Sequence, residues 1–118
     1  MKGILSILSW VPVPDGGTCS ASKAAAWAFT NWLRTGLRGQ GTQVVGVHAG
    51  PIDTDMASQL TLPKLKPIDV VRQVLSAVES GRDEVLADEM TRQVKAGLSN
   101  EPGIYLNFNP EGDLATAA

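Results

Sequence analysis

The stretch TCSASKAAAW, residues 18–27, marks the point where a loop enters a helix. The segment before it, WVPVPDGG, contains two prolines and two glycines, which are typical of a loop. Ser20 can cap the helix and Gly39 can end it, so we expect a helix from about residue 20 to 38. We predict that its broad apolar face packs on the core: Ala21, Ala25, Ala28, Phe29, Trp32, Leu33 and Leu37.

Short apolar segments on both sides of this helix are typical of buried strands. They are residues 3–9 (GILSILS), the valine-rich residues 42–50 (TQVVGVHAG) and residues 84–88 (EVLAD). Pro67 opens a second helix over residues 67–80, which Gly81 ends. We place the core face of that helix on Val70, Val71, Val74, Leu75 and Val78.

The order strand, helix, strand, helix, strand predicts an α/β fold with a parallel sheet and crossover helices. A short helix near residues 88–98 follows the third strand. We therefore expect one folded unit over residues 1–98 and a loosely ordered tail over residues 99–118. Ligands of such sheets bind at the carboxyl ends of the strands, which here are residues 6–10, 49–55 and 87–88.

Composition excludes several other classes of protein. The chain has 118 residues, of which 43% are hydrophobic and 19% charged, and its net charge of -2 comes without a basic run or an acidic tail. We therefore expect one domain that binds neither nucleic acid nor a membrane. Serines and prolines break the first apolar run, so we expect no signal peptide. One cysteine allows no internal disulfide, and we predict a cytoplasmic protein without a metal site.

The spacing of three polar residues then directs attention to a known family. Ser6 lies thirteen residues before Cys19, and Lys23 lies four residues after it. Together with CSASKAAA, with AGPIDTDM at residues 49–56 and with PIDVVRQVLSAVESGRDEVLAD, this spacing resembles the C-terminal half of a short-chain dehydrogenase/reductase. The resemblance covers residues 3–95, and it implies a partial Rossmann-like, doubly wound parallel sheet of three strands.

The resemblance also implies catalytic roles for three residues, together with NAD or NADP as cofactor. In the family a serine orients the substrate carbonyl, a tyrosine exchanges a proton with it, and a lysine activates the tyrosine and binds the nicotinamide ribose. Ser6 and Lys23 match the serine and the lysine, whereas Cys19 stands in the place of the tyrosine. Residues of the later turn would bind the nicotinamide end of the cofactor: Gly50, Pro51, Ile52 and Thr54.

Cys19 is the main departure from the family pattern. A thiol lacks the ring that carries the phenol to the substrate, and an acid or base must come within hydrogen-bond reach to act. We therefore expect Cys19 to be a poor catalyst. A different use, as a nucleophile activated by the helix N-terminus and Lys23, would make the chain a small cysteine-dependent enzyme. We interpret His48, the only histidine, as a polar residue near a strand end.

The resemblance also leaves parts of the family pattern unmatched. Ala49 replaces the usual proline of the turn, and GLRGQG, residues 36–41, follows a helix, so we interpret it as a helix stop. The family's glycine-rich cofactor motif and catalytic asparagine would lie before residue 1. We expect an exposed edge on strand 3–9, and either marginal stability or self-association. On the first helix we expect Trp27, Asn31 and Arg34 to form a dimer interface.

Two hypotheses about function follow. The first is an NAD(P)-dependent oxidoreductase acting on a small carbonyl or alcohol substrate, impaired or inactive as this chain. The alternative is a non-catalytic relative that acts as an interaction module, either as a homo-oligomer or paired with a related chain.

Overall fold

Three parallel strands form the centre of the molecule. The structure is a computed structural model, and it describes residues 2–13, 16–50 and 65–109. The strands are β1 (Lys2–Ser6), β2 (Val45–Ala49) and β3 (Glu84–Leu86), in the order β1-β2-β3. Their register sets Ser6 opposite Ala49, and His48 opposite Leu86. The α/β fold with a parallel sheet is confirmed.

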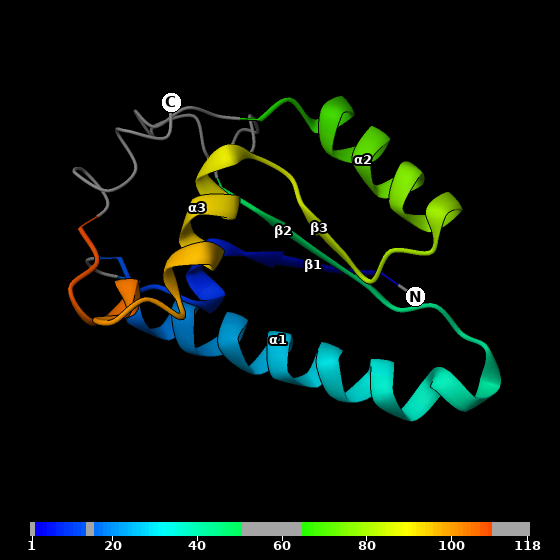
Figure 1. The fold of residues 1–118 in the computed structure, drawn as a ribbon, viewed down its shortest axis with the longest axis horizontal. Coiled ribbons are helices and arrows are strands. Elements are labelled where there is room, and N and C mark those ends of the chain that lie inside the picture. Colours follow the sequence, from blue (N-terminus) through cyan, green and yellow to red (C-terminus); the bar gives the residue numbers. More distant parts are fainter. Residues whose placement is uncertain (1, 14–15, 51–64, 110–118) are drawn as a thin grey trace.

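Helices cover both faces of this sheet, as a doubly wound fold requires (Figure 1). The helix α1 (Gly17–Leu37) crosses from β1 to β2, and α2 (Pro67–Ser80) crosses from β2 to β3 on the opposite face. A third helix, α3 (Glu89–Gly97), follows β3. Three short 3₁₀ helices complete the described secondary structure: η1 (Ile7–Ser9), η2 (Arg38–Gln40) and η4 (Ile104–Leu106).

The helix α2 has the predicted bounds. Pro67 is its first residue, and Gly81 ends it in the left-handed conformation with φ of 72°, which glycine adopts without strain. Its buried face is narrower than predicted, because only Val70, Val74 and Ala77 are buried against the sheet. The prediction was therefore wrong for Val71, Leu75 and Val78, which remain 49, 53 and 38% exposed.

The bounds of α1 differ from the prediction at both ends. It begins at Gly17 after Gly16, whereas the Ser20 hydroxyl donates to the Val11 carbonyl at 3.4 Å and does not cap the helix. At the other end η2 extends the helical path until Gly41, which adopts a φ of 72°. Gly41, rather than Gly39, therefore turns the chain toward β2.

The predicted core face of α1 is mostly exposed, and of its residues only Leu33 and Leu37 are half-buried. Phe29 and Trp32 of the expected core face are 58 and 65% exposed, and their rings stack on each other at 5.5 Å. Thr30 is buried, and Arg34 donates to the backbone carbonyls of Val44 at 3.3 Å and of Asp83 at 3.0 Å. Alanines and tryptophans occur on both faces of α1, so the spacing of apolar residues alone predicted the wrong face as buried.

A second core cluster lies on the α1 side of the sheet. It joins η1 to α3 through Ile7, Trp10, Val11, Met90 and Val94. Partly buried residues of the segment after α3, including Ile104 and Phe108, also pack against it. Residues 99–109 of the expected tail therefore contribute to the core, and residues 110–118 lie outside the described ranges.

Two further findings hold for the described ranges alone. No helix within them combines the length and the apolar character needed to cross a bilayer. Nor do they contain a group of three or more histidine, cysteine or acidic side chains placed to hold a metal ion.

Candidate functional site

Ser6 lies at the carboxyl end of β1. Its hydroxyl oxygen accepts a hydrogen bond from the backbone N–H of Leu8 at 3.2 Å, which makes Ser6 the cap of η1. The strand predicted over residues 3–9 therefore stops at Ser6, because this capping bond turns the chain into a 3₁₀ helix. The side chain is half-buried, and its partner across the sheet is Ala49. Gly50, which follows Ala49, accordingly lies at the same edge of the sheet.

Cys19 and Lys23 belong to the first two turns of α1. A spacing of four residues brings two side chains to the same side of a helix. Cys19 is a free, exposed thiol, and Lys23 is half-buried. No carboxylate in the described ranges forms an ion pair with Lys23.

The start of α1 is tied to the segment that follows Ser6. The bond from the Ser20 hydroxyl to the Val11 carbonyl joins the first turns of α1 to the residues after η1. The structure thus brings the helix start to the edge of the sheet that carries Ser6 and Gly50 (Figure 1). The catalytic roles of Ser6, Cys19 and Lys23 remain predictions.

Asp88 organises the edge where Gly50 lies, whereas the sequence analysis placed it only at the carboxyl end of the third strand. One oxygen of its carboxylate accepts from the backbone N–H of Thr91 at 2.9 Å and from the Thr91 hydroxyl, so Asp88 caps α3. The other oxygen accepts from the backbone N–H of Gly50 at 3.3 Å. The pattern of an aspartate three residues before a threonine at a helix start was a usable signal for this cap.

Gly50 is closely surrounded. A Cβ atom at this position would lie 2.9 Å from Asp88 Oδ2 and 2.9 Å from Met90 Sδ. The first residue of the predicted cofactor turn is therefore fixed by packing as well as by a hydrogen bond. The other residues of that turn, Pro51, Ile52 and Thr54, lie outside the described residues, and their role stays a prediction.

His48 is a buried ring of the core, whereas the sequence analysis interpreted it as a polar residue near a strand end. It is 1% exposed and stacks on Trp10 with ring centroids 4.3 Å apart and an interplanar angle of 18°. Its Nε2 atom lies 3.7 Å from Glu84 Oε1. Burial lowers the pKa of His48 from its ordinary value of 6.5 to about 4, although the Glu84 carboxylate acts in the opposite direction.

Comparison with a solved structure supports the sequence resemblance. The chain is similar to a short-chain dehydrogenase from Burkholderia cenocepacia, crystallised in complex with NADP, at 38% sequence identity and with a TM-score of 0.78. Over the matched part, the chain is similar to that short-chain dehydrogenase in both sequence and fold. The match covers 86% of this chain but only 43% of that enzyme, so the chain spans less than half of its length.

Two other comparisons give no match. Neither the models of protein families nor the curated proteins contain one for this sequence. The similarity to short-chain dehydrogenases therefore rests on the solved structure and on the motifs around Ser6, Cys19 and Lys23.

Proposed function

We propose that this chain supplies the substrate-side and nicotinamide-side residues of an NAD(P)-dependent oxidoreductase, with impaired activity because Cys19 replaces the catalytic tyrosine. One observation supports this most strongly. The edge of the sheet that carries Ser6 and Gly50 also receives the start of α1, with Cys19 and Lys23 four residues apart. The substrate class is a small carbonyl or alcohol compound, and a cytoplasmic location is part of the proposal.

The described residues fit the nicotinamide end of the cofactor. Lys23 offers a half-buried ammonium without a described ion-pair partner, suited to a ribose hydroxyl. Ser6 offers a hydroxyl whose oxygen accepts one hydrogen bond and whose hydrogen can still be donated to a carbonyl oxygen. When bound, the cofactor would supply the hydride, and the task of these residues is to bind and orient.

The described residues do not fit the pyrophosphate end of the cofactor. A pyrophosphate site needs a glycine turn whose backbone N–H groups are open to the ligand at a helix start. At the start of α1 this space is filled, because a Cβ atom on Gly16 would lie 2.6 Å from Val13 Cγ2. The Gly16 N–H is also bonded to the Val13 carbonyl at 3.0 Å. We assign no phosphate contact to this turn.

Proton transfer is the step that Cys19 limits. A side chain that gives a proton to the substrate oxygen must reach it directly or through one water molecule. Cys19 lies in the first turn of α1, is exposed, and has a side chain that ends at the Sγ atom. The Ser6 hydroxyl can orient a carbonyl, but the thiol falls short of the place that a phenol oxygen would take.

A variant series tests this proposal. We expect Cys19→Tyr to raise the rate of NADPH oxidation with a panel of small aldehydes and ketones, whereas Cys19→Ser leaves the low rate of the parent chain unchanged. Ser22→Ala is a matched control, because Ser22 is exposed and, among the described residues, its hydroxyl donates to the Cys19 carbonyl, at 2.9 Å. A Cys19→Ser variant that loses a rate present in the parent would contradict the proposal and favour thiol catalysis.

The alternative of an interaction module has its own observation. The stacked pair Phe29 and Trp32 lies exposed on α1, and Ile68 and Leu75 lie 52 and 53% exposed on α2. Large exposed apolar side chains on a helix are typical of protein contacts. The expected interface of Trp27, Asn31 and Arg34 is not available for this purpose, because these side chains line a cavity against the sheet.

Sedimentation analysis tests the interaction-module alternative. We expect Trp32→Glu to reduce the apparent mass of an associated chain to that of the monomer, while Gln93→Glu, on the exposed side of α3, leaves it unchanged. Association that survives Trp32→Glu would show that α1 is not the contact surface.

A further inference from the structure

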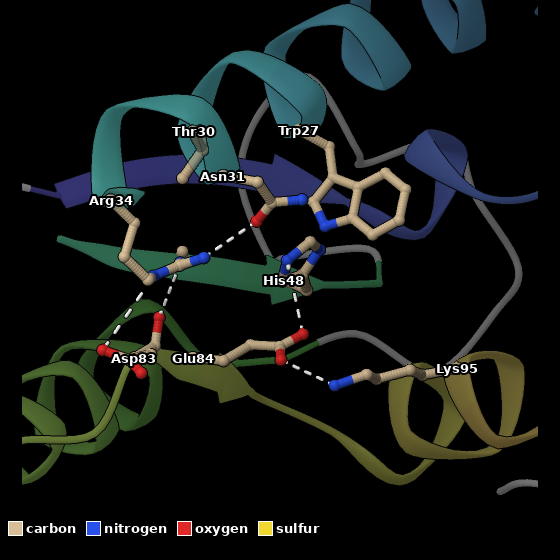
Figure 2. Close-up of a pocket in the computed structure, with 9 residues that line it drawn as sticks. Trp27, Thr30, Asn31, Arg34, His48, Asp83, Glu84 and Lys95 are labelled. Atoms are coloured by element: carbon tan, nitrogen blue, oxygen red, sulfur yellow. Dashed lines mark hydrogen bonds and ion pairs between the residues drawn. The ribbon is translucent and has the colours of Figure 1, made fainter. Parts of the chain in front are cut away.

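A cavity of about 120 Å³ lies between α1, the α3 side of β3 and the middle of β2 (Figure 2). His48, Glu84, Lys95 and Arg34 are among the residues that line it. A cavity of this size has room for several water molecules. The proposed oxidoreductase function does not use these four residues, and the inference below is independent of it.

Glu84 stands between two nitrogen bases and offers one carboxylate oxygen to each. Its Oε2 atom lies 2.6 Å from Lys95 Nζ, and its Oε1 atom lies 3.7 Å from His48 Nε2. Figure 2 shows the two contacts leaving Glu84 for side chains on different elements, α3 and β2. A single carboxylate therefore faces one permanent cation and one group that becomes a cation when it takes up a proton.

The surroundings of His48 hold it neutral in the present arrangement. Burial is the largest cause of its lowered pKa, the charges of Lys95 and Arg34 lower the pKa further, and Glu84 raises it. The charge of Arg34 is balanced by a different carboxylate, because its Nε atom lies 3.9 Å from Asp83 Oδ1. The rings packed nearby, Trp10 and Trp27, carry no charge. Removal of the Lys95 charge would therefore leave the Glu84 carboxylate available to pair with His48.

A second arrangement is available to the same groups. The Lys95 side chain is 41% exposed, and an ion pair at such a position contributes little net stability, so Lys95 can leave Glu84 for solvent. A protonated His48 would then lie between the Glu84 carboxylate and the face of Trp10. A cation over an indole face is attracted by the ring, which favours this arrangement once the proton is bound.

We propose that Glu84 is a carboxylate shared between two alternative cations, Lys95 and protonated His48, and that the charge at position 95 controls proton uptake by the buried imidazole. In one state the ion pair ties α3 to β3. In the other state the pair forms between β3 and β2, and α3 loses this ion pair but keeps the bond from Arg92 to the Leu86 carbonyl at 2.8 Å. Proton uptake is thereby coupled to the attachment of α3, whose Met90 and Val94 pack with Trp10.

The single histidine makes the test direct, because its imidazole resonance can belong to no other residue. We would follow that resonance by NMR from about pH 7.5 to 3 in the parent chain and in Lys95→Met. The midpoint is expected near 4 in the parent and about one pH unit higher in Lys95→Met, as expected for the loss of one nearby positive charge. Glu84→Gln is expected to move the midpoint in the opposite direction, because it removes the charge that raises it.

Two control variants complete the design. Lys66→Met removes an exposed lysine at the start of α2 and is expected to leave the midpoint unchanged. Lys95→Arg keeps the charge and is expected to titrate like the parent, and Lys95→Gln replaces Lys95→Met if the methionine variant does not fold. A midpoint in Lys95→Met and Lys95→Gln equal to that of the parent would overturn the proposal, and so would a higher midpoint in Glu84→Gln.

Discussion

Acidification is expected to weaken the fold through His48 in a pH range where most carboxylates are still ionised. The folded chain holds this imidazole at a pKa of about 4, against an ordinary value of 6.5. Between these two values the unfolded chain binds more protons than the folded chain, so stability rises with pH. The His48 contribution is fully present above pH 6.5 and is lost as the pH falls toward 4.

The size of the effect follows from the same two values. A difference of one pKa unit corresponds to 1.36 kcal/mol, so the free energy of unfolding falls by about 2 kcal/mol by pH 5 and by about 3 kcal/mol by pH 4. Because the His48 ring is 1% exposed, solvent screening reduces this loss of stability only slightly. A loss of this size is a large part of the total stability of an ordinary domain.

Urea unfolding followed by circular dichroism measures this loss directly. His48→Phe keeps a flat ring against Trp10 and cannot titrate, so it should lose about 2 kcal/mol less than the parent chain between pH 7 and pH 5. His48→Gln serves if the phenylalanine variant does not fold. Equal pH dependence in the parent and in the variants would refute the argument that burial keeps His48 neutral.

Two further predictions concern stability. Gly50→Ala should lower the free energy of unfolding by about 1–3 kcal/mol, because the new Cβ atom meets two atoms at 2.9 Å, whereas Gly36→Ala on open α1 surface should stabilise the chain by about 0.5 kcal/mol. Arg34→Met should remove about 2 kcal/mol, since it breaks hydrogen bonds to two backbone carbonyls, while Arg38→Met on the exposed η2 should have little effect. Urea unfolding midpoints measure the stability change of all four variants. An equal midpoint shift in the two variants of a pair would contradict the packing or hydrogen bonding that the prediction assumes.

The order of elements could be predicted because it depends on strong local signals. Pro67 and Gly81 mark the ends of α2 by their fixed backbone preferences, and both appear where expected. The valine-rich run around Val45 could belong only to a buried strand. These signals act over a few residues, and the parallel α/β arrangement follows from their order.

The orientation of α1 could not be predicted in the same way. Both sides of this helix carry apolar residues, and the choice between them depends on Arg34, which reaches the carbonyls of Val44 and Asp83. These partners are distant from Arg34 in the sequence, so no local pattern predicts the contacts. The same is true of the stack between His48 and Trp10 and of the bond from Gly50 to Asp88, which form only when the sheet is assembled.

We propose that this chain carries nicotinamide-side residues similar to those of short-chain dehydrogenases, with Lys23 in the position that binds the cofactor. Titration of the chain with NADPH, followed by isothermal calorimetry, tests this claim most directly. The parent chain should bind, Lys23→Met should bind about tenfold more weakly, and Lys66→Met should bind like the parent. No binding by the parent, or equal affinity in all three proteins, would contradict the claim and leave the interaction module as the better account.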